Sequence, residues 1–381
     1  MEPAASFSSL PAGLVQDILR HLDLKGQGRA ACVSKLCASA VLPLAPALAH
    51  YVTAGDAPAV RRLLSKPDVR LGLDNPSCER GRTPLLMAVA QDNPEIFAAL
   101  LEAGAATEPR DVHGRSDLIL AAALGQVSMV AALLAADAAL EAEDKNGCRA
   151  LHLAAMEGYA STVEMLLAAG AALEAEAKDG WRPLYCAAEN GHASTVGALL
   201  AAGAALEAED KDGYRPLHWA AAYCHASTVE ALLAAGAALE AEAKDGWRPL
   251  HFAAEDGHAS AVEVLLAADA ALGADTKDGR LPLHLAATYG HVSTVEALLA
   301  AGAALEAETE DGSRALHFAA ANGHGPVLAK LVAAGADLTA ATKDGKSALQ
   351  LAESGGHAGA VDAILVAGGT APAAGAAAID T

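Results

Sequence analysis

The chain of 381 residues is acidic, with 26 basic against 47 acidic side chains and a formal net charge of −21. Such a surface repels phosphate backbones and anionic lipids, so we expect neither nucleic acid nor membranes as partners and favour a basic protein. No apolar run reaches the length of a membrane span and the N-terminus has no signal-peptide layout, so we expect a cytoplasmic or nuclear location.

Residues 1–46 form a predicted domain with an apolar helical pattern of its own. Ser9 precedes Leu10-Pro11, which suits the start of a helix. Apolar side chains then recur at helical spacing and would share one face of that helix: Leu14, Val15, Ile18, Leu19 and Leu22. Composition alone leaves open a plain helical cap that shields the first unit of a repeat array.

The order of these residues resembles the F-box. Its pattern of Leu-Pro, two hydrophobic pairs, Leu-Asp and Val-Ser-Lys is met by Leu10-Pro11, Leu14-Val15, Ile18-Leu19, Leu22-Asp23 and Val33-Ser34-Lys35. Gln27, Gly28 and Cys37 depart from residues that are usual in the family. The resemblance implies a small three-helix module that binds a Skp-type adaptor, and through it a cullin, by way of Leu10, Pro11, Leu14, Val15, Ile18, Leu19, Leu22 and Val33.

After this module, a glycine and its surroundings recur every 33 residues. The glycines are Gly81, Gly114, Gly147, Gly180, Gly213, Gly246, Gly279, Gly312 and Gly345. A fixed period of this length is typical of one supersecondary unit stacked on copies of itself. The sequence therefore predicts a solenoid of ten helix pairs, because residues 47–80 also align with the unit as a degenerate first copy.

The copy that begins at Gly213 shows how one unit folds. Pro216 suits the first turn of a helix that we expect to end near Tyr223, because proline fixes φ and needs no N–H there. A second helix around Thr228 ends before Gly236, which suits a left-handed C-terminal cap. The segment after Gly236 is polar and closes on an Asp-Gly turn, so we predict a finger-like loop.

This unit resembles the ankyrin repeat. The family's Thr-Pro-Leu-His core stands here as Arg215-Pro216-Leu217-His218, and its Gly-His turn recurs at Gly191-His192, Gly257-His258, Gly290-His291 and Gly323-His324. The resemblance implies an all-α solenoid of helix-turn-helix units with β-turn fingers, with nine 33-residue repeats over residues 81–368. Residues 369–381 are rich in Gly, Ala and Pro, which predicts a disordered tail.

Three residues stand where the repeat would have a glycine. Cys224 stands at a turn glycine, whereas Asp137 and Asp269 replace the glycine that ends a second helix. All three positions need a left-handed backbone, which Asp tolerates better than Cys.

Catalysis and metal binding are not expected. Eleven of the 14 histidines fall at two fixed repeat positions, which indicates structural hydrogen bonds. The segment from Glu209 to Gly213 has some features of a calcium loop, but Trp219 stands where the bidentate glutamate is required. The sequence has no phosphate-binding loop and no nucleophile elbow. We therefore predict a protein that is not an enzyme and that has no cofactor and no metal.

Two sets of side chains remain as binding candidates. Arginines replace the capping threonine in five repeats, where they form either a basic ladder for an acidic ligand or ion pairs with finger carboxylates: Arg149, Arg182, Arg215, Arg248 and Arg314. Aromatic residues follow the opening glycine at Trp181, Tyr214 and Trp247, and we predict that they anchor a target, as Trp and Tyr commonly do. Trp219, Tyr223 and Tyr289 extend this candidate surface, although Trp219 also suits packing between helices.

The sequence thus predicts a specificity subunit of an SCF-type (Skp, cullin, F-box) ubiquitin ligase, a monomer outside the complex, whose ankyrin groove holds a target of basic character. Two alternatives stay open. The chain could be an ankyrin scaffold whose N-terminal module only caps the stack, or a viral decoy that occupies the host adaptor without delivering a target.

Overall fold

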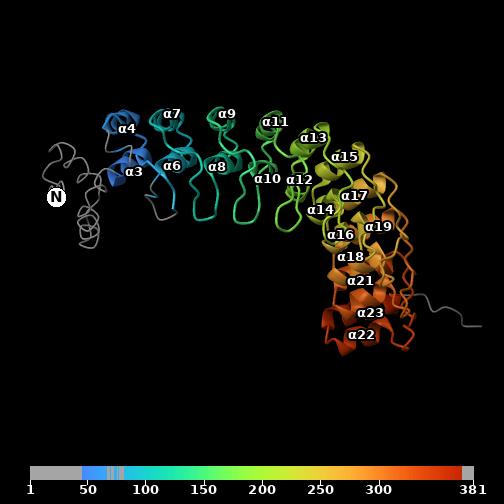
Figure 1. The fold of residues 1–381 in the computed structure, drawn as a ribbon. Coiled ribbons are helices and arrows are strands. Elements are labelled where there is room, and N and C mark those ends of the chain that lie inside the picture. The colour runs from blue at the N-terminus through green and yellow to red at the C-terminus, as the bar shows by residue number, and fades with distance from the viewer. Residues whose placement is uncertain (1–44, 67–68, 70–72, 75, 77–80, 371–381) are drawn as a thin grey trace, which may run out of the picture. The chain divides into compact units, whose positions relative to one another are not determined.

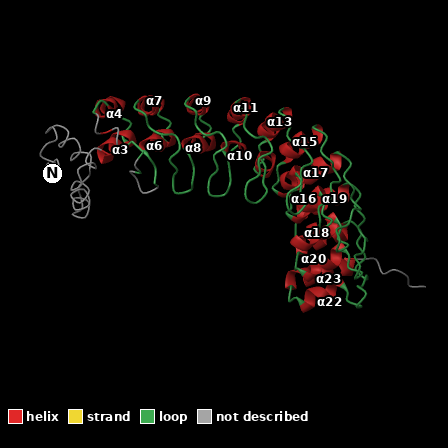
Figure 2. Cartoon of the chain, viewed as in Figure 1, coloured by secondary structure: helices red, strands yellow, loops and turns green. Residues whose placement is uncertain are grey.

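The computed structural model describes residues 45–66, 69, 73–74, 76 and 81–370, and these residues fold into 20 α-helices with no strand (Figures 1 and 2). The predicted all-α ankyrin solenoid is confirmed. The chain divides into two compact units, residues 1–178 and 179–381, and each is described by itself. The eight predicted adaptor-binding residues lie outside the described part of the chain.

The described residues of the first unit contain four helix pairs. They are α3 (Ala45–Thr53) with α4 (Ala57–Leu64), α6 (Pro84–Ala90) with α7 (Pro94–Glu102), α8 (Asp117–Ala123) with α9 (Val127–Ala135), and α10 (Ala150–Met156) with α11 (Ala160–Ala168). The first helices of successive pairs pack in the order α3, α6, α8 and α10. The pair α3 and α4 corresponds to the predicted degenerate copy, and α3 begins two residues before the predicted boundary at residue 47.

Between residues 179 and 370, the second unit contains six helix pairs. They are α12 (Pro183–Glu189) with α13 (Ala193–Ala201), α14 (Pro216–Ala222) with α15 (Ala226–Ala234), α16 (Pro249–Glu255) with α17 (Ala259–Ala267), α18 (Pro282–Tyr289) with α19 (Val292–Ala300), α20 (Ala315–Ala321) with α21 (Gly325–Ala333), and α22 (Ala348–Ser354) with α23 (Ala358–Thr370). First helices pack on first helices and second helices on second helices. Helix α23 continues two residues into the predicted tail, so the tail prediction is wrong for residues 369 and 370.

Local sequence explains each helix pair. Pro216 occupies the first turn of α14, and Gly236 takes the left-handed conformation just after α15, at φ 92°. Leu217 and Leu232 are buried between the two helices and their neighbours. The left-handed backbone predicted for Cys224, Asp137 and Asp269 is confirmed, because their φ angles are 64°, 57° and 66°.

Buried histidines connect five of the first helices, α10, α14, α16, α18 and α20, to the finger that follows each of them. In α14, the Arg215 N–H donates to His218 Nδ1 at 2.9 Å, and His218 Nε2 lies 2.9 Å from the Ala241 carbonyl. A backbone N–H can only donate, so Nδ1 accepts and Nε2 carries the hydrogen. His152, His251, His284 and His317 make the same two contacts. Their position matches the structural role that the sequence predicted.

The histidines after the turn glycines connect neighbouring repeats. His225 Nε2 lies 2.8 Å from the Glu189 carbonyl, at the end of the preceding first helix. His258, His291, His324 and His357 repeat this contact. The first set of histidines therefore fixes the finger to its helix, and the second set holds the backbone of adjacent repeats in register.

Candidate protein-binding surface

Five aromatic rings of the second unit form a continuous row. The centroid distances are 5.2 Å from Trp181 to Trp219, 5.7 Å from Trp219 to Tyr214, 5.2 Å from Tyr214 to Phe252 and 5.0 Å from Phe252 to Trp247. All five rings are half-buried. The predicted anchors Trp181, Tyr214 and Trp247 are thus brought together, and the helix residues Trp219 and Phe252 bridge them. We call these five residues the aromatic row.

Hydrogen bonds to finger carboxylates fix two rings of the row. Trp219 Nε1 donates to Asp210 Oδ2 at 3.2 Å, and the Tyr214 hydroxyl donates to Asp245 Oδ2 at 2.9 Å. Burial, together with the hydrogen bond to Asp245, raises the pKa of Tyr214, so its phenol stays protonated. The rings are therefore held in place before any partner arrives, which lowers the entropy cost of binding.

The two tyrosines at helix ends are placed differently from each other. Tyr223 follows α14, is 47% exposed, and stacks on Trp219 at 6.2 Å between centroids, so it extends the aromatic row. Tyr289 ends α18, is 49% exposed, and stacks on His291 at 6.4 Å. Within the described residues Tyr289 has no ring contact with the aromatic row. Five of the six predicted target-binding residues therefore cluster, and the sixth lies apart.

Four of the five candidate arginines form ion pairs with glutamates of the finger that precedes them. Arg215 contacts Glu207 at 2.7 Å and Glu209 at 2.9 Å, and the other carboxylate oxygen of Glu207 accepts the Ala238 N–H at 2.8 Å. Glu207 thus joins its own arginine to the backbone of the next repeat. Arg149, Arg248 and Arg314 have equivalent carboxylate partners. This geometry favours the ion-pair interpretation over a ladder for an acidic ligand.

Sequence reasoning missed the role of Glu207 as a link between repeats. The available signal was the Leu-Glu-Ala-Glu segment, whose first glutamate stands eight residues before the arginine in several fingers. Only the stacked structure shows that one carboxylate serves two partners.

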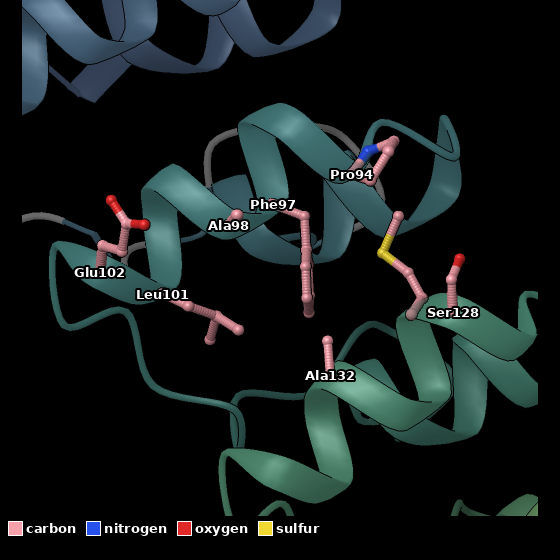
Figure 3. Close-up of a pocket in the computed structure, with 8 residues that line it drawn as sticks. Pro94, Phe97, Ala98, Leu101, Glu102, Ser128 and Ala132 are labelled. Atoms are coloured by element: carbon pink, nitrogen blue, oxygen red, sulfur yellow. The ribbon is translucent and has the colours of Figure 1, made fainter.

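The first unit has an apolar cleft of about 290 Å³ between α7 and α9. Phe97 and Leu101 of α7 face Ala132 of α9 across it, with Glu102 and Ser128 near its two ends (Figure 3). The lining offers apolar contact and no pair of groups for acid-base chemistry. Among the described residues no cluster of His, Cys, Asp and Glu could hold a metal ion. None of the helices in the described part is long and apolar enough to cross a membrane.

Comparison with protein families identifies the repeat. A model described as ankyrin repeats (3 copies) matches residues 47–146, 107–177, 151–243 and 235–309, and one described as ankyrin repeats (many copies) matches residues 298–352. The chain belongs to the ankyrin-repeat family, whose arrays act as scaffolds for protein–protein interaction. Neither match extends into residues 1–46. A search of curated proteins finds no match.

Proposed function

We propose that the chain is the target-recognition subunit of an SCF-type ubiquitin ligase in the cytoplasm or nucleus. The second unit would bind a target protein, and residues 1–46 would dock on a Skp-type adaptor and through it on a cullin. The observation that supports target binding is the aromatic row, with the exposed Tyr223 stacked against it. The adaptor contact rests on the residue order from Leu10 to Lys35.

The aromatic row has the properties of an interface anchor. Large rings that are half-exposed and held by their neighbours can bury much area at little entropy cost. Repeats outside the row carry Cys148, Arg280 and Ser313 at the same position as Trp181. The solenoid therefore folds without aromatic residues there, which favours a role in binding over a role in the core.

The target-binding half can be tested with a double variant. We expect Trp181→Ala with Trp247→Ala to weaken target capture about thirtyfold, because loss of an anchor costs about 2 kcal/mol. The measurement is quantitative mass spectrometry of proteins captured from a eukaryotic cell extract. Phe318→Ala is the matched control, since Phe318 is also half-buried but lies outside the row. Equal capture by folded wild-type and double-variant proteins would rule out this surface.

The adaptor half has its own test. Wild-type protein should co-purify with a purified Skp-type adaptor, and Leu10→Ala with Pro11→Ala should abolish this without changing the circular dichroism of the array. If the wild-type protein does not bind the adaptor, the second candidate is an ankyrin scaffold without a ligase role, which the extent of the family match favours. Adaptor binding without ubiquitination of any captured protein would instead support the decoy.

A further inference from the structure

In one repeat of the second unit a cation takes the place of a ring of the aromatic row. The residue after the opening glycine is aromatic in three successive repeats and basic in the fourth: Trp181, Tyr214, Trp247 and Arg280. Tyr214 packs on Phe252, a ring of the next first helix, at 5.2 Å between centroids. The Arg280 guanidinium lies over Phe318, the equivalent ring two repeats along, at 5.6 Å from its centroid. Rings at this helix position therefore accept a guanidinium as well as an aromatic neighbour.

The carboxylate of Asp245 is hydrogen-bonded to two members of the aromatic row. Its Oδ2 accepts the Tyr214 hydroxyl at 2.9 Å, and its Oδ1 accepts the Trp247 N–H at 3.1 Å. Both donors are neutral, and among the described residues Asp245 enters no salt bridge. A fixed negative charge without a cation partner thus lies beside the rings.

The basic residues next to Asp245 in the sequence have other partners. The Arg248 guanidinium contacts the carboxylate of Glu240 at 2.8 Å. The Lys244 ammonium donates to the Lys211 carbonyl. Neither cation contacts the Asp245 carboxylate, so a cation of a partner can do so.

Asp210 is held in a similar way in the preceding finger. Its Oδ1 accepts the N–H groups of Asp212 and Tyr214 at 2.9 Å each, and its Oδ2 accepts the Trp219 indole N–H at 3.2 Å. All three donors are neutral, and Asp210 also enters no salt bridge in the part of the chain that the structure describes. The aromatic row thus has fixed negative charge at two successive fingers, which favours a cationic side chain over an anionic one.

The remaining acceptor capacity of Asp245 favours arginine over lysine. A carboxylate oxygen has two lone pairs, and each oxygen of Asp245 accepts one hydrogen bond in the structure. One lone pair is left on each oxygen, as the two parallel N–H groups of a guanidinium require. A guanidinium is also flat and stacks on aromatic faces, whereas an ammonium is compact and strongly hydrated.

We propose that Tyr214, Trp247, Phe252 and Asp245 bind an arginine side chain of the target. The guanidinium would stack on a ring of the row, as Arg280 does on Phe318, and would donate two hydrogen bonds to Asp245. The inference rests on the proposed function, because it names the side chain that the target presents to the aromatic row.

Three blocked Gly/Ser peptides provide the probe, each with one central residue: arginine, lysine or citrulline. The chain has three tryptophans, so the indole N–H signals of the nitrogen-labelled full chain are few, and the one from Trp247 is assigned by its loss in Trp247→Ala. We expect the arginine peptide to shift this signal with about fivefold higher affinity than the lysine peptide. Citrulline keeps the flat shape without the charge and should bind more weakly than arginine.

A charge-neutral variant tests the carboxylate. Asp245→Asn should weaken binding of the arginine peptide about fivefold, because the charge and one acceptor oxygen are lost. Asn146 occupies the equivalent position in an earlier finger, so the fold accepts asparagine there. Asp344→Asn is the matched control, since Asp344 holds the same finger position in a repeat with Ser313 in place of Tyr214, and it should alter binding less than twofold.

Three results would overturn the arginine site. They are the absence of binding by the arginine peptide, equal affinity for the arginine and lysine peptides, and an equal effect of Asp245→Asn and Asp344→Asn.

The outcome can be separated from that of the proposed function. If Asp245→Asn captures the targets that Trp181→Ala with Trp247→Ala loses, the arginine site is wrong and the aromatic surface stands. If the double tryptophan variant also captures them, the proposed function itself fails.

Discussion

Two buried polar side chains in first helices differ in whether their polar atoms have hydrogen-bond partners. Asp117 in α8 is 0% exposed and His218 in α14 is 1% exposed. The two ring nitrogens of His218 bond two backbone groups, whereas neither carboxyl oxygen of Asp117 has a partner on another residue. A buried polar group is costly mainly when it lacks a partner. His218 therefore adds to the stability of the second unit, whereas the buried carboxyl of Asp117 lowers the stability of the first unit.

The titration behaviour of the two residues follows from this difference. Burial lowers the pKa of His218, so the ring stays neutral and keeps the acceptor that the Arg215 N–H needs. Burial raises the pKa of Asp117 well above its usual value, and repulsion from Glu108 and Asp74 adds to the shift. Ionising Asp117 in the folded chain is therefore unfavourable.

The largest expected effect comes from removing the satisfied histidine. His218→Leu should lower the free energy of unfolding by about 3 kcal/mol, because it leaves the Arg215 N–H and the Ala241 carbonyl unpaired. Urea denaturation followed by circular dichroism measures the change. Leucine is already present at the equivalent position, as Leu86, so its size fits the repeat.

His225→Leu serves as the control for this variant. It removes one inter-repeat bond, to the Glu189 carbonyl, from a partly buried site and should cost about half as much. If both variants lose the same free energy of unfolding, the number of hydrogen bonds that each histidine makes does not determine its contribution to stability.

The second prediction concerns a substitution that should stabilise the folded chain. Asp117→Ala should raise the free energy of unfolding by about 2 kcal/mol at neutral pH, because it removes a buried carboxyl without a partner. Ala150 occupies the equivalent position in α10, so the backbone accepts alanine. Asp111→Ala is the control and should destabilise the chain, since Asp111 bonds the Arg115 guanidinium at 2.8 Å.

The gain from Asp117→Ala should depend on pH. Because the folded pKa of Asp117 is raised, the wild-type chain keeps its full stability below the unfolded pKa of about 3.9 and loses it as the pH rises through the folded pKa. The gain of the variant over wild type should therefore be smallest near pH 4 and should increase toward neutral pH. Urea denaturation of both proteins at several pH values measures this difference, and a constant gain across the range would contradict the raised pKa.

The sequence was informative where one residue determines local geometry. The 33-residue glycine period, Pro216 and the left-handed Cys224 were all predictable, because backbone preferences are local. The buried state of Asp117 could not be predicted, since it depends on how the adjacent repeats stack. The aromatic row was predicted in part: the sequence placed Trp181, Tyr214 and Trp247 one repeat apart, but only stacking shows that Trp219 and Phe252 bridge them.

The smallest predicted effect concerns a polar group that recurs in the second helices. Thr228 of α15 is fully buried, and its hydroxyl has no partner among the described residues. The same holds for Thr162, Thr195 and Thr294. Other repeats carry Ala261 and Val327 at this position, so the fold accepts apolar side chains there.

Thr228→Val keeps the shape of the side chain and removes the hydroxyl, so the free energy of unfolding should rise by about 1 kcal/mol. Thr288→Val is the matched control, because the Thr288 hydroxyl donates to the His284 carbonyl at 2.7 Å and its loss should not stabilise the chain. Urea denaturation of both variants measures the change in the free energy of unfolding that each substitution causes. If Thr228→Val destabilises the protein as much as Thr288→Val, the Thr228 hydroxyl is satisfied in solution, and the contrast between Asp117 and His218 would then rest on charge and not on missing partners.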